Sequence, residues 1–142
     1  MTEKLRVKSV IEVVGTPENF VKEAMDIVMQ KLQERKDIKM LEQERFGTTK
    51  IENKPFWSTF CDLELEVNDV DVLLNYCVEF LPSSVDIVEP VGFQFQNYEI
   101  NRLFNDIIAR LHEYHMSMKN MQAENILLKR DMAKLKEPAE KK

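Results

Sequence analysis

The chain has few of the residues on which several common function classes depend. Only three of its 142 residues are glycine, so no glycine-rich phosphate-binding loop can be assembled. The only cysteines, Cys61 and Cys77, both fall in apolar patterns, which predicts a reduced, cytoplasmic setting rather than a disulfide framework. No apolar run approaches the roughly 20 residues of a membrane-spanning helix. Residues 1–6 are charged and lead into a strand-like segment, which is not the pattern of a signal peptide.

Positive charge is scarce in the first two thirds of the chain. Residues 1–97 carry 11 basic and 18 acidic side chains, whereas residues 98–142 carry 9 and 7, so the net charge of −5 is the sum of −7 and +2. An acidic protein is a poor fit to phosphate-dominated nucleic-acid binding. The contrast predicts two kinds of structure, a domain over 1–97 and a helix over 98–137, followed by a disordered tail over 138–142.

Residues 5–90 show the order strand, helix, strand, strand, helix, strand. We expect strands over 5–14, 38–46, 56–67 and 85–88, and helices over 17–35 and 70–81. The strand over 56–67 has the clearest alternation, and the strand over 38–46 is ambiguous. This order predicts an α+β, ferredoxin-like sandwich with two helices on one face of a four-stranded antiparallel sheet.

Local signals predict how these elements begin and end. Thr16 reads as the N-cap of the first helix, and Asn68 or Asp69 as that of the second. Residues 47–55 suit a hairpin loop, and residues 93–96 a short extra edge strand. The apolar stripe expected on the second helix is Val70, Leu73, Leu74, Cys77 and Leu81.

Residues 98–137 contain no glycine or proline and repeat apolar side chains in heptads. Roughly 38 helical residues at 1.5 Å each would extend about 57 Å, which is longer than a small domain can cover. The a positions are Phe104, Leu111, Met118, Asn125 and Met132, and the d positions are Ile107, Tyr114, Met121, Leu128 and Leu135. This repeat holds for about five heptads and predicts a coiled coil.

Asn125 is the one polar residue at these ten positions. A single Asn at an a position favours a parallel, two-stranded coil in fixed register. The g residues Glu124 and Asp131 would face the e residues Lys129 and Lys136 of the partner, which favours the same orientation. Two alternatives stay open: the helix folds back over its own domain, or the coil has three or four strands.

Candidate chemistry is sparse elsewhere. Gly15 and Thr16, between the first strand and helix, could hold an anion or small ligand on free N–H groups. His112 and His115 lie on the outer flank of the long helix with no third ligand spaced to help, so we expect no metal site. Neither cysteine has an adjacent basic group, so we expect no catalytic thiol. Since these candidates supply no reactive group, we also expect a non-enzymatic protein without a cofactor.

Aromatic residues give one candidate surface. Phe56 and Phe60 fall on the strand face opposite Trp57 and Leu63. Together with Phe93 and Phe95 they could form an exposed apolar patch for docking, or pack beneath the base of the long helix.

The strand–helix order, with residues 10–15 (Val-Ile-Glu-Val-Val-Gly) feeding the first helix, resembles ferredoxin-like domains of the ACT type over residues 5–90. That resemblance implies a regulatory ligand site near Gly15 and side-by-side sheet dimers. The whole chain, including residues 81–85 and 123–129, is also similar to small uncharacterised archaeal proteins that join such a domain to a coiled coil.

Taken together, these patterns predict a cytoplasmic, non-enzymatic homodimer that acts in interaction or scaffolding with an unknown protein partner, without membrane association. An ACT-like small-molecule sensor and a nucleic-acid-associated factor are the alternatives.

Overall fold

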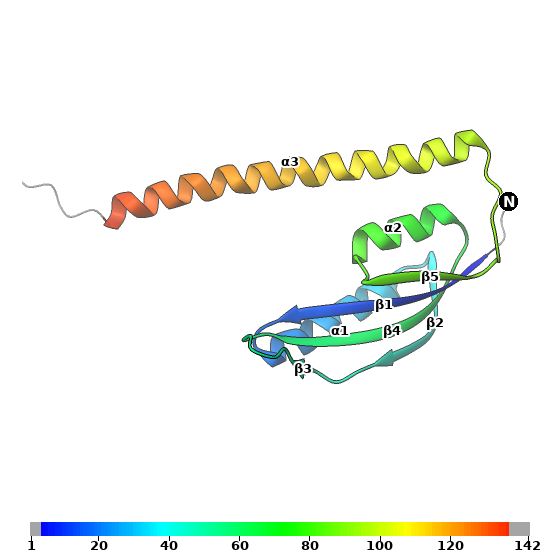
Figure 1. The fold of residues 1–142 in the computed structure, drawn as a ribbon, viewed down its shortest axis with the longest axis horizontal. Helices are drawn as coiled ribbons and strands as arrows, with labels where there is room; N and C mark the ends of the chain where they lie inside the picture. The colour runs from blue at the N-terminus through cyan, green and yellow to red at the C-terminus, as the bar shows by residue number, and fades with distance from the viewer. Residues whose placement is uncertain (1–3, 137–142) are drawn as a thin grey trace, which may run out of the picture. The chain divides into compact units, whose positions relative to one another are not determined.

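The computed structural model describes residues 4–136 of the chain. Its elements in chain order are β1 (Leu5–Gly15), α1 (Glu18–Glu34), β2 (Ile38–Arg45), β3 (Thr49–Lys50), β4 (Trp57–Val67), α2 (Val70–Phe80), β5 (Ser84–Glu89) and α3 (Asn97–Lys136). They form two compact units, one ending at Phe95, which we call the head, and one beginning at Gln96, which contains α3 (Figure 1).

The head is the predicted ferredoxin-like sandwich. Its sheet has the order β2-β4-β1-β5 with antiparallel neighbours, and β3 adds a short pairing to β4. The two central strands, β1 and β4, pair along their whole length, from Leu5 opposite Val67 to Gly15 opposite Trp57. The prediction of an α+β fold followed by a long helix is confirmed.

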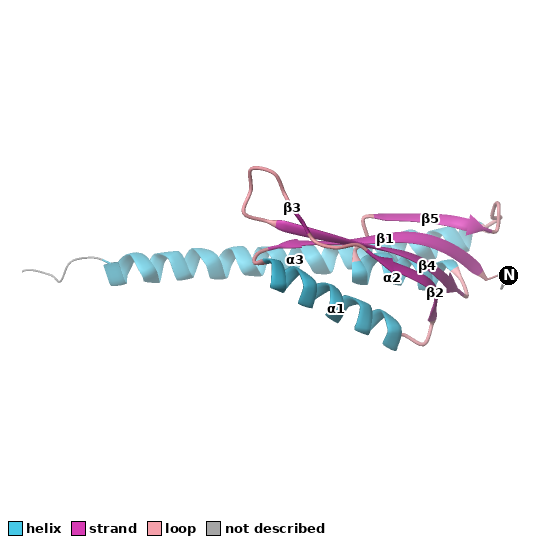
Figure 2. Cartoon of the chain, turned by 90° about the horizontal axis from the view of Figure 1, so that it is seen from below, coloured by secondary structure: helices cyan, strands magenta, loops and turns pink. Residues whose placement is uncertain are grey.

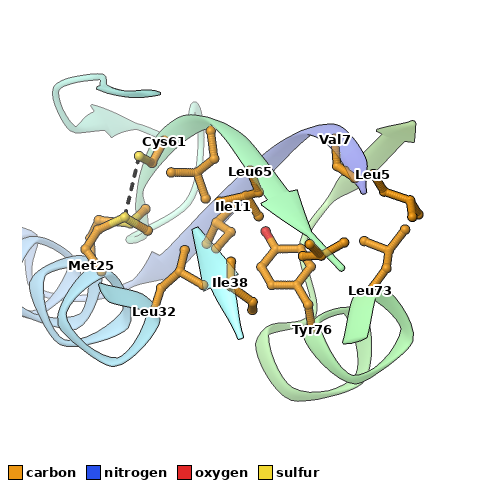
Figure 3. Packing of buried hydrophobic residues seen from close by; sticks show 13 residues of the cluster. Leu5, Val7, Ile11, Met25, Leu32, Ile38, Cys61, Leu65, Leu73 and Tyr76 are labelled. Carbon is orange, nitrogen blue, oxygen red and sulfur yellow. Dashed lines mark hydrogen bonds between the residues drawn. The ribbon is translucent and has the colours of Figure 1, made fainter. Parts of the chain in front are cut away.

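Alternation along the central strands puts one set of side chains into the core. The inward residues of β1 and β4 are Leu5, Val7, Ser9, Ile11, Cys61, Leu63, Leu65 and Val67, and all are buried. Helix α1 covers this face with the stripe Val21, Met25, Met29 and Leu32 (Figure 2). Figure 3 shows the resulting cluster. Within the core, the Cys61 thiol lies 3.7 Å from the Met29 sulfur.

Tyr76 of α2 is the core residue that apolar spacing missed. Its side chain is fully buried with Leu73, whereas Leu81 of the predicted stripe is 71% exposed. The Ser9 hydroxyl donates to the Ser84 carbonyl at 2.8 Å and therefore accepts the Tyr76 hydroxyl, also at 2.8 Å. Burial raises the pKa of Tyr76 to about 12. The Tyr76 phenol thus ties α2 to β1 through Ser9, and the Ser9 hydroxyl in turn ties β1 to β5, so that the phenol oxygen is satisfied inside the core.

Three local predictions are wrong. Thr16 does not cap α1: Pro17 is the N-cap residue, and no side chain closes that cap. The loop over 47–55 contains β3, because Thr49 and Lys50 still reach the end of β4. Residues 93–96 form no strand, and the Phe93 and Phe95 rings instead stack on each other at 5.4 Å.

Other boundaries match their signals. The Asp69 carboxylate accepts the Val72 N–H at 3.0 Å, which confirms Asp69 as the N-cap of α2. Leu81 ends that helix in the left-handed conformation, and its N–H donates to the Cys77 carbonyl. The predicted tail over 138–142, together with Glu137, lies outside the described residues.

Candidate oligomer interface

Helix α3 runs for 40 residues, and each of its ends has residues that stabilise a helix terminus. At the start, the Glu99 carboxylate accepts the Gln96 N–H at 3.3 Å, while the Gln96 carbonyl accepts the Glu99 N–H at 3.0 Å. This reciprocal pair resembles half of a capping box. Lys134 and Lys136 lie in the last turn, where the helix dipole favours positive charge. The helix is therefore well defined by its own sequence at each end.

The heptad residues of α3 are apolar but not covered. No residue of α3, all of which the structure describes, is buried. Met121 and Leu128 are 65% and 60% exposed, and Leu135 is 85% exposed. Phe104, Leu111, Tyr114, Met118 and Met132 are also exposed, and Ile107 is intermediate. The stripe that predicts a coiled coil is therefore exposed over most of its length.

Residues at a and d positions lie on one side of a helix because a 3.5-residue repeat stays close to the 3.6-residue turn. Asn125 lies within that stripe, between Met121 and Leu128. Glu124 and Lys129 are five residues apart, too far around the helix to face each other in one chain, and the same holds for Asp131 and Lys136. In a parallel pair those residues would meet across the seam, which is the line along which the a and d residues of the two helices pack. That assignment, like the oligomer itself, stays a prediction.

Some exposed apolar residues of α3 lie outside the heptad stripe and were not singled out from the sequence. Met116, Ile126 and Leu127 are more than half exposed, and they occupy f, b and c positions. The heptad repeat predicts packing only for the a and d residues, so it gives no prediction for these three. They leave apolar surface on the side of α3 that a two-stranded coil would turn outward.

The turn proposed as a ligand site has its space partly filled. The Phe20 ring lies against Gly15 so closely that a Cβ there would stand 2.9 Å from the ring Cε2. The Phe20 and Val21 N–H groups donate to the Pro17 carbonyl. The Glu18 carboxylate accepts the Thr48 hydroxyl and lies 3.9 Å from the Lys22 ammonium. A carboxylate of the chain itself therefore already lies at the start of α1, beside Gly15 and Thr16.

Aromatic side chains are exposed at the β3 end of the sheet. Phe56 and Phe60 are each close to two fifths exposed, as predicted from alternation, and Phe46 is 45% exposed. Phe46 joins them because its N–H donates to the Phe60 carbonyl at 2.9 Å. The sequence did not single out Phe46, since the strand that precedes it was ambiguous.

The same open sheet face carries a shallow hollow of about 380 Å³. Its lining includes Lys8 and the carboxylates Glu42, Glu44, Asp62, Glu64 and Asp86. Glu42 pairs directly with Glu64 across β2 and β4, and Glu44 with Asp62. Like charges in such positions weaken a strand pairing. Lys8 of β1, which lies opposite both Glu64 and Asp86, offsets part of that repulsion.

The described residues show neither a metal-ligand cluster nor a thiol whose pKa is lowered. Across residues 4–136, no group of three or more His, Cys, Asp or Glu side chains is placed to hold a metal ion. Both cysteines are free, and burial raises the pKa of each thiol. A raised pKa leaves the thiol protonated and unreactive near neutral pH.

No helix within the described residues has the length and apolar character needed to cross a bilayer. Comparison with curated proteins and with solved structures gave no match. A family model does match, over residues 6–138, and so spans both the head and α3. The chain therefore belongs to the MJ0538 family.

Proposed function

We propose that this protein is a non-enzymatic, homo-oligomeric interaction or scaffold protein whose chains pair through α3 as a parallel, two-stranded coiled coil. One observation carries the proposal: α3 repeats apolar side chains in heptads, none of them is buried, and all except Ile107 are exposed. A free helix of this kind exposes a continuous apolar stripe to water, which a second copy of the same stripe would cover.

The stripe is large enough to drive association. Complete burial of one Leu, Met or Phe side chain contributes about 1.5–3 kcal/mol, and α3 offers seven such residues at a and d positions in addition to Ile107 and Tyr114. Asn125 lowers this total and selects two strands in register. The pairs Glu124–Lys129 and Asp131–Lys136 add little energy each and select the parallel orientation.

The paired heads would then give the assembly a two-fold symmetric surface for a protein partner. The exposed Phe46, Phe56 and Phe60 supply apolar contact area on each head. A cytoplasmic setting is supported by the two free cysteines, one of which, Cys61, is a core residue.

Light scattering of the full chain at micromolar concentration tests this proposal. The expected mass is twice the chain mass of 16.8 kDa. A single-chain mass across the micromolar range would remove the coiled coil. A mass of three or four chains would keep the oligomer and reject the two-stranded form.

A further inference from the structure

The second half of α3 has a distinct outward face, made of the b, c and f positions of residues 116–134. In a two-stranded coil these positions point away from the seam. Met116, Ile126 and Leu127 occupy three of them and are 57%, 60% and 53% exposed. A coil that covers every a and d residue would still leave these three in water.

The spacing of these residues suits another helix. Met116, Ala123 and Leu127 are separated by seven and four residues, so they lie on one line along α3. From Met116 to Leu127 there are eleven steps of 1.5 Å along the helix axis, or about 16 Å, which is three helical turns. Ala123 is small and leaves a low point between Met116 and Leu127 into which a side chain of a second helix can pack.

The charge of this face is of one sign. The only acidic residues between 114 and 136 are Glu124 and Asp131, and both take g positions beside the seam. The outward positions carry Lys119, Arg130 and Lys134 instead. In the first half of α3 the outward positions are acidic on balance, because they carry Glu99, Asp106 and Glu113 against the single cation Arg102.

We propose that the outward face of residues 116–134 binds an acidic amphipathic helix of a partner protein. Its apolar line would meet the partner's apolar stripe, and its three cations would meet carboxylates that flank that stripe. This inference rests on the proposed function, because these positions point outward only if the a and d residues form the seam.

Two other anionic partners fit the face less well. A nucleic-acid backbone would pair with Lys119, Arg130 and Lys134 but would leave Met116, Ile126 and Leu127 in water. An anionic membrane favours helices with tryptophan, phenylalanine or leucine along the apolar face, and the outward positions of residues 116–134 carry no aromatic residue and a single leucine, Leu127. An acidic helix uses both the apolar and the cationic groups.

Fluorescence anisotropy with the full chain tests the proposal. The probe is a labelled 21-residue peptide with leucine at two positions of each heptad and glutamate beside them, and its control is a scrambled peptide of the same composition. Arg130→Glu with Lys134→Glu removes the cations, and Lys36→Glu with Lys50→Glu makes the same charge change on exposed head residues. Vesicles of phosphatidylglycerol and phosphatidylcholine, and a 20-base-pair DNA duplex, are the competing ligands.

The full chain should bind the amphipathic peptide at least tenfold more tightly than the scrambled one. The variant at Arg130 and Lys134 should lose at least tenfold in affinity, and the head control less than twofold. Equal binding of both peptides, equal loss in both variants, or tighter binding of vesicles or DNA would overturn the inference. Light scattering on the same samples separates the two proposals: two chains without peptide binding rejects this inference alone, whereas one chain rejects the coil and the inference with it.

Discussion

Strand β4 and helix α3 both repeat apolar residues, and the chain treats the two repeats in opposite ways. Along β4, Cys61, Leu63, Leu65 and Val67 are at most 3% exposed, because α1, α2 and β1 surround them. Along α3, Met121 and Leu128 are at least 60% exposed. The head thus completes its own core, whereas α3 has a core-like pattern without a core. A pattern of this kind supports the proposed role of α3 in assembly, in which another chain supplies the apolar partner.

Substitutions in the seam of α3 should have the largest effect, because they should dissociate the dimer while leaving the core of the head intact. Met121→Asp with Leu128→Asp replaces two buried apolar contacts per chain with charges, so the dissociation constant of the dimer should rise on the order of 1000-fold. Light scattering should then show single chains at micromolar concentration. The loss of far-UV circular dichroism should be large, because an isolated helix is marginal in water.

The matched control for that variant adds the same charge away from the seam. Asn120→Asp with Ala133→Asp lies at c and b positions and should leave the mass unchanged. Equal dissociation by both pairs would show that charge, not seam packing, controls the mass.

A substitution in the core of the head should lower the stability of the head without changing the oligomer mass. Leu65→Ala leaves a cavity at a fully buried position of β4 and should lower the free energy of unfolding of the head by about 3 kcal/mol. Trp57 is the only tryptophan, so its fluorescence during urea unfolding reports on the head alone. The oligomer mass should stay the same, and a fall to single chains would mean that the head contributes to association.

Asn125 should limit the strength of the seam. Asn125→Leu completes the apolar stripe and should raise the midpoint of thermal unfolding of α3, by an amount equivalent to about 1–2 kcal/mol, while mixing oligomer states. Circular dichroism and light scattering of the variant measure the two effects. A large loss of stability would place Asn125 in a different network.

The buried phenol of the head should produce a smaller effect at alkaline pH. The pKa of Tyr76 is about 12 in the folded chain, and a tyrosine in the unfolded chain ionises near 10. The folded state keeps its proton in this interval while the unfolded state releases it, so stability falls as pH rises from 10 towards 12. At pH 11 the free energy of unfolding of the head should be about 1 kcal/mol lower than at neutral pH. Urea titration with Trp57 fluorescence as the signal measures this difference. Tyr76→Phe should flatten that slope, and an unchanged slope would assign it to other groups.

The sequence predicted the sheet better than the packing on it. Strict alternation from Trp57 to Val67 is a strong signal, since a shift of one residue would reverse every side chain. Tyr76 was not placed in the core from the sequence, because a buried phenol hydroxyl needs a hydrogen-bond partner and only the tertiary contact with Ser9 supplies one. Thr16 was a reasonable N-cap by residue type, but the chain enters α1 one residue later, at Pro17.

For the candidate interface on α3, the repeat could be predicted from the sequence, but the exposure of residues outside the repeat could not. The heptads and Asn125 could be read directly from the residues, because a coiled coil is a one-dimensional pattern. The exposure of Met116, Ile126 and Leu127 could not be predicted in this way. Outside the a and d positions, the residue type alone does not show whether an apolar side chain is buried or exposed. Phe46 was missed for a related reason: its place beside Phe60 depends on the register of β2 against β4, which has a bulge between Met40 and Glu42.

Disulfide formation at position 125 tests the parallel, in-register coil most directly. Asn125→Cys places a thiol at an a position, and in a parallel pair the two thiols face each other across the seam. Mild oxidation of the full-length variant should convert most of it to a covalent dimer on a non-reducing gel, whereas the native chain, with Cys61 buried and Cys77 partly buried, should not cross-link. A variant that stays dimeric by light scattering but forms no disulfide would contradict the parallel, in-register arrangement.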